Sequence, residues 1–314
     1  MNKKVLGIVA VIIIVLIGGT FLFNGKSSSQ KEEVGELLTI EHRFGITEVK
    51  KNPKNVVVLD YGSLDILSTL GVEVKALPKQ GLPSYLSEYK DEKYVDIGGL
   101  KEFDIEKINE LKPDLIIIEG RQEDSYEELS KIAPTIGLGS ESTDFMKSLE
   151  FSCNILGQIF EKEDEIKENL NEIKSKLEKV STKVKETNSN AAILMVADNS
   201  ISVYGEKSRF NMLYNEFEFK INDASVGDDK HGQTISYEYL LEKNPDYIFI
   251  IDKNTITGTE NNTAKEIVEN ELVKKTSAYK NNKIIYLDSQ AWYVGGVGFK
   301  AVNTRISEIE NAIK

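Results

Sequence analysis

Residues 230–254, KHGQTISYEYLLEKNPDYIFIIDKN, predict a short helix followed by a buried strand. Thr234 or Ser236 can cap the helix, and Pro245 ends it because proline disfavours the helical conformation of the residue before it. The uninterrupted apolar run at 247–251 is typical of a strand that is covered on both faces. The stretch therefore predicts half of a parallel α/β unit.

The same order of elements occurs earlier, at residues 104–118. Asp104 can cap a short helix there, Pro113 ends it, and the apolar run at 115–118 predicts a buried strand. Upstream, residues 55–77 predict a strand, a helix and a further strand. Helices that alternate with buried strands in this way indicate two similar α/β lobes.

Long helical segments separate the two predicted lobes. Residues 145–160 and 165–186 both carry helical periodicity, and an apolar stripe from Leu170 to Val180 marks the second as amphipathic. We therefore expect a long helix that joins the lobes. The expected order of domains is a membrane anchor or signal segment at 1–25, a flexible tether at 26–36, an N-terminal lobe at 37–142, connecting helices at 143–188 and a C-terminal lobe at 189–314.

Several smaller elements are expected around this framework. Residues 37–49 predict a hairpin that carries a structural histidine, His42. A helix is expected at 210–217 and a closing helix at 300–314. Residues 295–298 are glycine-rich but lack the lysine of a phosphate-binding loop, so they predict a flexible loop.

Composition and charge exclude several classes of binding partner and metal site. The chain has 314 residues, more than one ordinary core requires, and its net charge of −12 argues against a nucleic-acid partner. Cys153 is the single cysteine and is expected in the core, so an intramolecular disulfide and a thiolate metal cluster are excluded. Two histidines cannot form a three-histidine metal site. No nucleophile elbow or paired-histidine motif occurs, so we expect no enzymatic activity.

The N-terminus begins with positive charge and continues as a long apolar run. Lys3 and Lys4 precede nineteen uncharged, mostly apolar residues, which would span ~28 Å as a helix, close to the thickness of a bilayer core. We therefore expect export and an uncleaved membrane anchor at 5–23. The run lacks the cysteine of a lipoprotein signal, and cleavage near the small residues 27–29 is the alternative.

Polar and aromatic residues that follow predicted strands or open predicted helices are the candidates for ligand binding. Arginine is scarce beside abundant lysine, so Arg121 and Arg209 stand out as planar, permanently charged donors. The other candidates in such loops are His231, Lys253 and the pair Trp292–Tyr293.

These stretches together resemble the class III substrate-binding proteins of iron-uptake ABC transporters. Within that family the chain is most similar to binding proteins for ferric catecholate siderophores, of the enterobactin and petrobactin type. The resemblance covers nearly all of residues 37–314. The stretches that carry it are residues 55–60, 103–122, 208–210, 231–232, 242–249 and 292–293.

The resemblance implies a fold and a function. We expect two Rossmann-like α/β lobes joined by a long α-helix, with neither enzymatic activity nor an intrinsic cofactor. The ligand would be Fe(III) complexed by a siderophore, captured in the cleft between the lobes and delivered to the permease of an ABC importer. The protein would be a monomer, held on the extracytoplasmic face of the cell membrane by its N-terminal segment.

The resemblance also assigns residues. One set would bind the anionic siderophore: Arg121, Arg209, Lys253 and Trp292. Two side chains would ligate the iron of the bound complex: His231 and Tyr293. Two acids would contact the permease: Glu123 and Glu216. Lys253 departs from the family pattern, in which the third cation is often arginine, and a lysine keeps the charge but weakens bidentate contact.

Coordination chemistry agrees with this assignment. Ferric iron is hard and prefers catecholate and phenolate oxygens, while an imidazole can fill a vacant position. A siderophore with two catechols supplies four donors, so one tyrosine and one histidine would complete six. Because the complex is anionic, arginines in an acidic protein form a focused positive site for it.

Three alternatives stay open. A binding protein of the same fold for haem or cobalamin could use the same tyrosine or histidine. An anchored surface enzyme is the second alternative, and the sequence offers it no nucleophile and base. A sensory or adhesive ectodomain is the third, which the tether and anchor would allow equally well.

Overall fold

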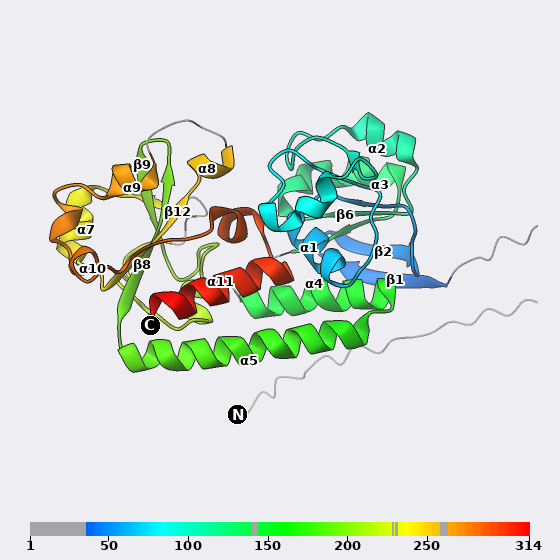
Figure 1. Ribbon diagram of the computed structural model, residues 1–314. Helices are drawn as coiled ribbons and strands as arrows, with labels where there is room; N and C mark the ends of the chain where they lie inside the picture. Colours follow the sequence, from blue (N-terminus) through cyan, green and yellow to red (C-terminus); the bar gives the residue numbers. More distant parts are fainter. Residues whose placement is uncertain (1–35, 140–143, 228, 230–231, 258–262) are drawn as a thin grey trace, which may run out of the picture. The chain divides into compact units, whose positions relative to one another are not determined.

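The computed structural model (Figure 1) describes residues 36–139, 144–227, 229, 232–257 and 263–314. These residues belong to one compact unit, Gly35–Lys314. The predicted anchor at 5–23 and the candidate ligand His231 lie outside the described residues. Within the described part of the chain, no helix is long and apolar enough to cross a membrane.

The first lobe is built on a parallel five-stranded sheet. Its strands lie in the order β5 (Val95–Asp96), β4 (Ala76–Leu77), β3 (Val56–Val58), β6 (Leu115–Ile118) and β7 (Thr135–Gly137). This order runs outward in both directions from β3 and β6, so their carboxyl ends form a switch point, the place where open α/β sheets bind ligands. Asp60 follows β3, and Glu119 follows β6.

Local sequence explains the helices of this lobe. They are α1 (Tyr61–Thr69), η1 (Ser84–Lys90), α2 (Ile105–Leu111), η2 (Gly120–Ser125) and α3 (Tyr126–Ile132). Asp104 caps α2 by accepting a hydrogen bond from the backbone N of Lys107 at 2.9 Å. Lys112 then takes a left-handed conformation with φ of 47°, which ends α2 before Pro113. The predicted helix, proline and strand at 104–118 are confirmed.

The second lobe has a mixed sheet. Its strands lie in the order β11 (Gln233–Thr234), β9 (Ser200–Tyr204), β8 (Asn190–Ala197), β12 (Tyr247–Asp252) and β13 (Ile284–Tyr286), with β10 (Lys220–Ile221) also beside β8. Strands β8, β12 and β13 are parallel, whereas β9 is antiparallel to β8. The short helices are α6 (Met212–Asn215), α7 (Tyr237–Lys243), α8 (Asn254–Thr257), α9 (Ala264–Val268), η3 (Val273–Lys275), α10 (Ser277–Lys280) and η4 (Gln290–Val294).

The unit of α7 and β12 repeats the arrangement of α2 and β6. Ser236 caps α7 by accepting from the backbone N of Tyr239 at 3.4 Å, and Asn244 ends the helix at φ 45° before Pro245. Five of the six residues of β12 are buried, as the apolar run predicts. Both copies therefore rely on a local cap, a left-handed residue and a proline.

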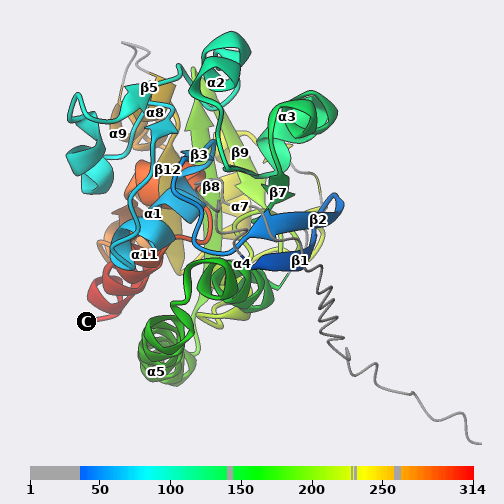
Figure 2. The same cartoon turned by 90° about the vertical axis from the view of Figure 1, so that its right-hand side faces the viewer.

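Three helices connect the lobes (Figures 1 and 2). They are α4 (Phe145–Phe160), α5 (Glu163–Thr187) and α11 (Phe299–Ala312). Helix α5 packs on α4 and α11, and α11 also packs on α1 of the first lobe. The predicted apolar stripe of α5, from Leu170 to Val180, is buried against them. One hydrophobic cluster contains residues from both sheets and from all three helices, so the lobes share part of a core.

The N-terminal hairpin is confirmed as β1 (Leu37–His42) and β2 (Gly45–Lys50). His42 is buried, and its Nδ1 accepts hydrogen bonds from the backbone N of Phe44 at 3.2 Å and of Gly137 at 3.1 Å. The histidine is structural, as expected, because it ties the hairpin to β7. Cys153 is likewise buried in the core, as expected.

The expected helix at 210–217 is wrong in length. Only α6 is helical there, and three consecutive side chains, Met212, Leu213 and Tyr214, are all buried. An amphipathic helix needs a solvent-facing stripe, and Asn215 is the only exposed residue at 210–217. Burial of most of the segment is therefore consistent with a helix of one turn.

Residues 295–298 form a loop, as expected, but most of the loop is buried, which the prediction of a flexible loop did not foresee. The segment packs closely on α1, where a Cβ atom on Gly298 would stand 2.3 Å from Oδ2 of Asp65. A Cβ atom on Gly62 would stand 3.0 Å from the backbone N of Val297. Glycine fits both positions because the side chain of Asp65 leaves no room for a Cβ atom at Gly298 and the backbone of Val297 leaves little room at Gly62.

Candidate functional site

A single π-helical turn, η4, leads from the second lobe toward the first. It follows β13, carries Trp292 and Tyr293, and precedes α11. π-Helical turns are rare and often occur at functional sites. Trp292 is only 5% exposed, and its Nε1 donates to Oε2 of Glu308 at 2.8 Å, which fixes η4 against α11. Tyr293 is half-buried.

Two arginines from different lobes meet at the backbone carbonyl of Tyr293. Nη2 of Arg121, in η2 of the first lobe, donates to this oxygen at 3.0 Å. Nη2 of Arg209, which lies between β9 and α6 of the second lobe, donates to the same oxygen at 2.8 Å. The guanidinium carbon of Arg209 lies 4.2 Å from the centre of the Tyr293 ring.

Lys253 completes this group. It directly follows β12, and its Nζ lies 5.9 Å from the centre of the Tyr293 ring. We call Arg121, Arg209, Lys253 and Tyr293 the cationic cluster. The fold thus brings together three positive side chains that are far apart in the sequence, and all of them are donors suited to carboxylate, catecholate or phosphate oxygens.

Two acids lie beside the cationic cluster in the first lobe, and the sequence analysis missed both. The carboxylate of Glu119 forms an ion pair with Nη1 of Arg121. Oδ1 of Asp60 caps α1 by accepting from the backbone N of Ser63 at 2.9 Å. Oδ2 of Asp60 is buried and has no hydrogen-bond partner among the described residues. Burial, reinforced by the charge of Glu119, raises the pKa of Asp60 to about 6.

A signal for these acids was present in the sequence. Each stands at the carboxyl end of a predicted parallel strand, in Val-Val-Val-Leu-Asp60 and in Leu-Ile-Ile-Ile-Glu119. Neighbouring parallel strands end at one edge of the sheet, so acids at two such ends can meet.

The two acids expected to contact a permease have different surroundings. Glu123 is exposed, and its Oε2 pairs with Nη2 of Arg43 at 3.0 Å. Oε1 of Glu216 accepts from the backbone N of Met146 at 3.2 Å, at the start of α4. Burial raises the pKa of Glu216 to about 7, and the nearby carboxylate of Asp144 adds to the effect. Glu216 therefore helps to hold α4 as well as being an acid near the surface.

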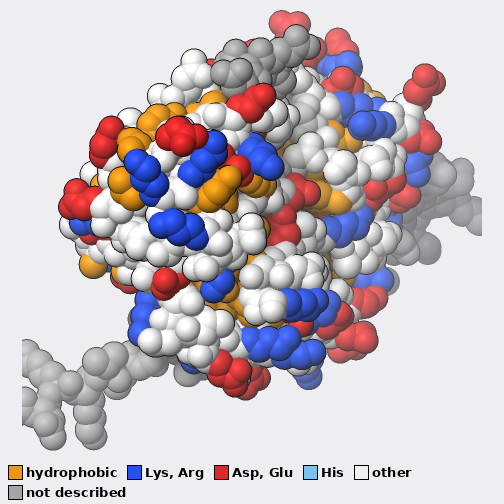
Figure 3. Space-filling view, turned by 60° about the vertical axis from the view of Figure 1, so that its left-hand side comes forward, with side chains coloured by type: hydrophobic (Ala, Val, Ile, Leu, Met, Phe, Trp, Pro, Cys, Tyr) orange, Lys and Arg blue, Asp and Glu red, His pale blue; other side chains and the backbone are white. Residues whose placement is uncertain are grey.

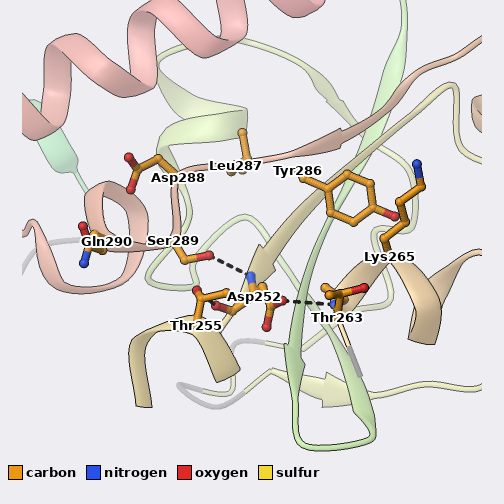
Figure 4. Close-up of a pocket in the computed structure, with 10 residues that line it drawn as sticks. Asp252, Thr255, Thr263, Lys265, Tyr286, Leu287, Asp288, Ser289 and Gln290 are labelled. Atoms are coloured by element: carbon orange, nitrogen blue, oxygen red, sulfur yellow. Dashed lines mark hydrogen bonds between the residues drawn. The ribbon is translucent and has the colours of Figure 1, made fainter. Parts of the chain in front are cut away.

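A cavity of about 370 Å³ lies elsewhere in the second lobe, at the carboxyl ends of β12 and β13 (Figure 4). Asp252 and Asp288 line it. Oδ2 of Asp252 accepts a hydrogen bond from the backbone N of Ala264 at 3.0 Å. The Oγ of Ser289 accepts one from the backbone N of Asp252 at 2.9 Å. Two acids and one lysine, Lys265, line the cavity, whereas three cations meet in the cationic cluster, so the cationic cluster is the better candidate for an anionic ligand.

Basic and acidic side chains are interspersed over the face of the molecule that Figure 3 shows. Among the described residues, no group of three or more His, Cys, Asp or Glu side chains is placed to hold a metal ion.

Known proteins share both the sequence and the fold. The profile of the family described as periplasmic binding protein matches residues 56–291. The chain is 41% identical to the petrobactin-binding protein YclQ of Bacillus subtilis over 100% of both chains. The crystal structure of YclQ matches with a TM-score of 0.86 and 44% identity, over 89% of this chain and 99% of that one.

Two further relatives come from Vibrio species. The ferric-anguibactin-binding protein FatB of Vibrio anguillarum is 31% identical over 87% of this chain and 86% of its own. The crystal structure of the periplasmic catecholate-siderophore binding protein VctP of Vibrio cholerae matches with a TM-score of 0.83 and 34% identity. That match covers 88% of this chain and 100% of VctP.

Proposed function

Because the chain belongs to the periplasmic binding protein family, we propose that it captures an anionic ferric siderophore of the catecholate class between its lobes and delivers it to an ABC importer. Its fold is the class III fold of that family, as the resemblance implied. The ligand class is supported by relatives named for petrobactin, ferric anguibactin and catecholate siderophores, all of which align over most of their length.

One observation carries the proposal for this chain: arginines from both lobes converge on one carbonyl oxygen. Nη2 of Arg121 and Nη2 of Arg209 donate to the carbonyl oxygen of Tyr293 at 3.0 and 2.8 Å. The Nζ of Lys253 lies 5.9 Å from the centre of the Tyr293 ring. Three cations held close together repel one another, and a ligand that carries several negative charges would offset this repulsion. A ferric catecholate complex is such a ligand.

We assign roles within the cationic cluster by chemistry. Arg121, Arg209 and Lys253 bind the catecholate oxygens through charge-assisted hydrogen bonds. Tyr293 supplies a phenolate oxygen to the iron of a tetradentate siderophore, and His231 supplies the remaining donor. Trp292, which is buried against Glu308, supports η4 behind Tyr293 and reports on the bound complex through its fluorescence.

The N-terminal segment has a separate proposed role. Residues 1–25 form an anchor that holds the protein on the extracytoplasmic face of the membrane, and residues 26–36 form a tether to the folded unit. The length and apolar character of residues 5–23 support this proposal. Intact-mass analysis of the membrane fraction tests it, and a mature chain that begins near Gln30 and accumulates in the medium would overturn it.

The remaining parts of the proposal concern organisation and partners. The lobes comprise residues 37–142 and 189–314 and are joined by residues 143–188. The protein works as a monomer without enzymatic activity or a resident cofactor. Its contacts with the permease include Glu123 and Glu216, of which the exposed Glu123 is the better placed because Glu216 also caps α4.

A titration of the unit Gly35–Lys314 against a panel of iron complexes tests the function. The panel contains a ferric tris-catecholate, a ferric bis-catecholate, a neutral ferric hydroxamate and haem. Trp292 is the only tryptophan, so its emission should fall as a coloured catecholate complex binds beside it. We expect both catecholates to bind at least tenfold more tightly than the hydroxamate, which is ~1.4 kcal/mol. Tight binding of haem without binding of either catecholate would instead support the haem-binding alternative.

A further inference from the structure

We propose that Glu119 determines which anions the cationic cluster accepts, because its carboxylate occupies one terminal nitrogen of Arg121 and an incoming anion has to replace it. This inference rests on the proposed function and extends it from the cations to an acid that opposes them. The ligand class it selects is a multiply charged chelate with several oxygen donors. Simple oxyanions such as sulfate or phosphate are the class that it excludes.

Both terminal nitrogens of Arg121 are already engaged within the protein. Nη1 pairs with Oε1 of Glu119, and Nη2 donates to the carbonyl of Tyr293 at 3.0 Å. The side chains of Arg121 and Glu119 are only 20% and 18% exposed. Partial burial reduces screening by water and salt, so this pair is stronger than an ion pair on the open surface.

The backbone holds Glu119 in position to make this pair. Glu119 directly follows β6 and caps η2, where its side chain accepts from the backbone N of Gln122. In return, Oε1 of Gln122 accepts from the backbone N of Glu119 at 3.1 Å. Gln122 itself is 1% exposed. The carboxylate is therefore tethered beside Arg121, at a high effective concentration.

A second acid limits where the carboxylate of Glu119 can move. Asp60 follows the neighbouring strand β3 and is 5% exposed, and the charge of Glu119 contributes to the raised pKa of Asp60. Displacement of Glu119 toward Asp60 would bring two carboxylates together, which costs free energy. The pair of Glu119 with Arg121 is thus favoured by the attraction between the two charges and by the repulsion that Glu119 would meet near Asp60.

Arg209 has no carboxylate partner among the described residues of the chain, and it contacts the carbonyl and ring of Tyr293 instead. A large chelate can bind Arg209 and Lys253 first, and these contacts offset the cost of displacing Glu119 from Arg121. A small oxyanion contacts too few cations at once to do so. The difference between several simultaneous contacts and one is the basis of the selection.

Replacement of Glu119 by glutamine in the full-length protein tests the proposal. Glutamine keeps an oxygen that can accept from the backbone N of Gln122, so the cap of η2 and the fold are retained, and a thermal melt checks this. Binding of a ferric tris-catecholate is measured by Trp292 fluorescence with sodium sulfate as competitor, at constant ionic strength set with sodium chloride. The matched control is Glu128→Gln, which removes an exposed acid from the first turn of α3.

We expect sulfate to change the apparent affinity of the wild-type protein and of Glu128→Gln by less than about twofold. In Glu119→Gln, the chelate should bind about fivefold more tightly without sulfate, and sulfate should weaken it by about fivefold or more. Equal sulfate sensitivity of wild type and Glu119→Gln would overturn the role of Glu119.

A direct titration with sulfate alone, followed by calorimetry, separates this inference from the proposed function. If no ferric siderophore binds to any variant, the proposed function fails, and the sulfate titration still decides the role of Glu119. Sulfate binding by Glu119→Gln that is at least about fivefold tighter than binding by the wild type supports the role. Equal binding overturns it.

Discussion

The two lobes repeat one α/β plan but surround their cations differently. In the first lobe, Arg121 follows a parallel strand at the switch point and pairs with Glu119, and the buried Asp60 lies nearby. In the second lobe, Arg209 follows the antiparallel strand β9 and lies against the rings of Phe210 and Tyr293, at 5.4 and 4.2 Å from their centres. The first cation is neutralised by an acid, whereas the second is covered by aromatic rings.

This difference indicates a division of work within one binding site. An aromatic face stabilises a cation without neutralising it, so the guanidinium of Arg209 can bind an anion without displacing a carboxylate, although the charge of Glu119 also acts on it. A carboxylate partner cancels part of the attraction of a cation for an anion, so an anion can bind Arg121 only by displacing the carboxylate of Glu119. We therefore expect the second lobe to supply most of the affinity and the first lobe to supply selectivity.

Replacement of the arginines should have the largest effect. Arg209→Gln should weaken binding of a ferric tris-catecholate by about 2–3 kcal/mol, because it removes a charge-assisted contact that the ligand makes without displacing a carboxylate. Arg121→Gln should cost only about 1 kcal/mol, because in the wild type the contact of the ligand with Arg121 is already offset in part by the displacement of Glu119. Fluorescence titration of both variants, with the neutral ferric hydroxamate as the control ligand, measures the two losses. Equal losses would remove the distinction between the lobes.

The next effect concerns stability and the acidic side of the comparison. The pKa of Asp60 is raised from 3.8 to about 6 in the fold, so the folded protein favours the protonated form. This contribution to stability is fully present below pH 3.8 and is lost as the pH rises toward 6. Asp60→Asn keeps the capping oxygen and cannot ionise. Between pH 4 and pH 7, the wild type should therefore lose about 2 kcal/mol relative to the variant.

Urea unfolding at both pH values measures this difference, and Asp65→Asn serves as a comparison. Burial also raises the pKa of Asp65 to about 6, although its Oδ2 accepts from the backbone N of Ala301 at 3.0 Å at the start of α11. A parallel loss of stability in Asp60→Asn and in the wild type would mean that Asp60 does not titrate in this range.

Tyr293 should discriminate between ligand types. Tyr293→Phe keeps the ring that contacts Arg209 and removes only the hydroxyl. A tetradentate bis-catecholate, which needs a protein donor for its iron, should lose about tenfold in affinity, or ~1.4 kcal/mol. A hexadentate tris-catecholate should lose much less, and His231→Ala should show the same contrast. Equal losses for both ligands would exclude these residues from the iron shell and leave charge as the basis of binding.

The smallest effect is expected for the third cation. Lys253→Arg would replace the ammonium group by a planar guanidinium that can donate two parallel hydrogen bonds to one ligand group. Affinity for the tris-catecholate should increase by about 0.5 kcal/mol, since the charge is unchanged and only the geometry of contact improves. The same titration measures it, with Lys253→Gln as the matched loss of charge. A decrease for Lys253→Arg would show that the shorter reach of lysine is required.

The elements that the sequence predicted best are those that depend on neighbouring residues. Asp104 and Ser236 each cap a helix by accepting from the backbone N of the residue three positions later, within the first turn. A proline follows each helix by two residues. The strands β6 and β12 are continuous apolar runs. Such features need no tertiary structure to be recognised.

The elements that sequence reasoning missed depend on distant contacts. The pair of Arg121 with Glu119 is close in sequence, but its meaning depends on Tyr293, which lies 172 positions away. The single turn of α6 is short because the surrounding core buries Met212, Leu213 and Tyr214 together. The binding roles of the cationic cluster stay predictions, although the fold places its members together.

The close approach of Gly298 and Gly62 to their neighbours has a consequence for redesign. Because the segment 295–298 meets α1 with little or no room for a Cβ atom at Gly298 or Gly62, larger side chains cannot be introduced at that joint without displacing its neighbours. Attempts to make the protein accept a wider cargo should therefore leave the joint unchanged and vary the residues that line the ligand itself. A library built on this rule would retain folded members, whereas one randomised at the joint would lose most of them.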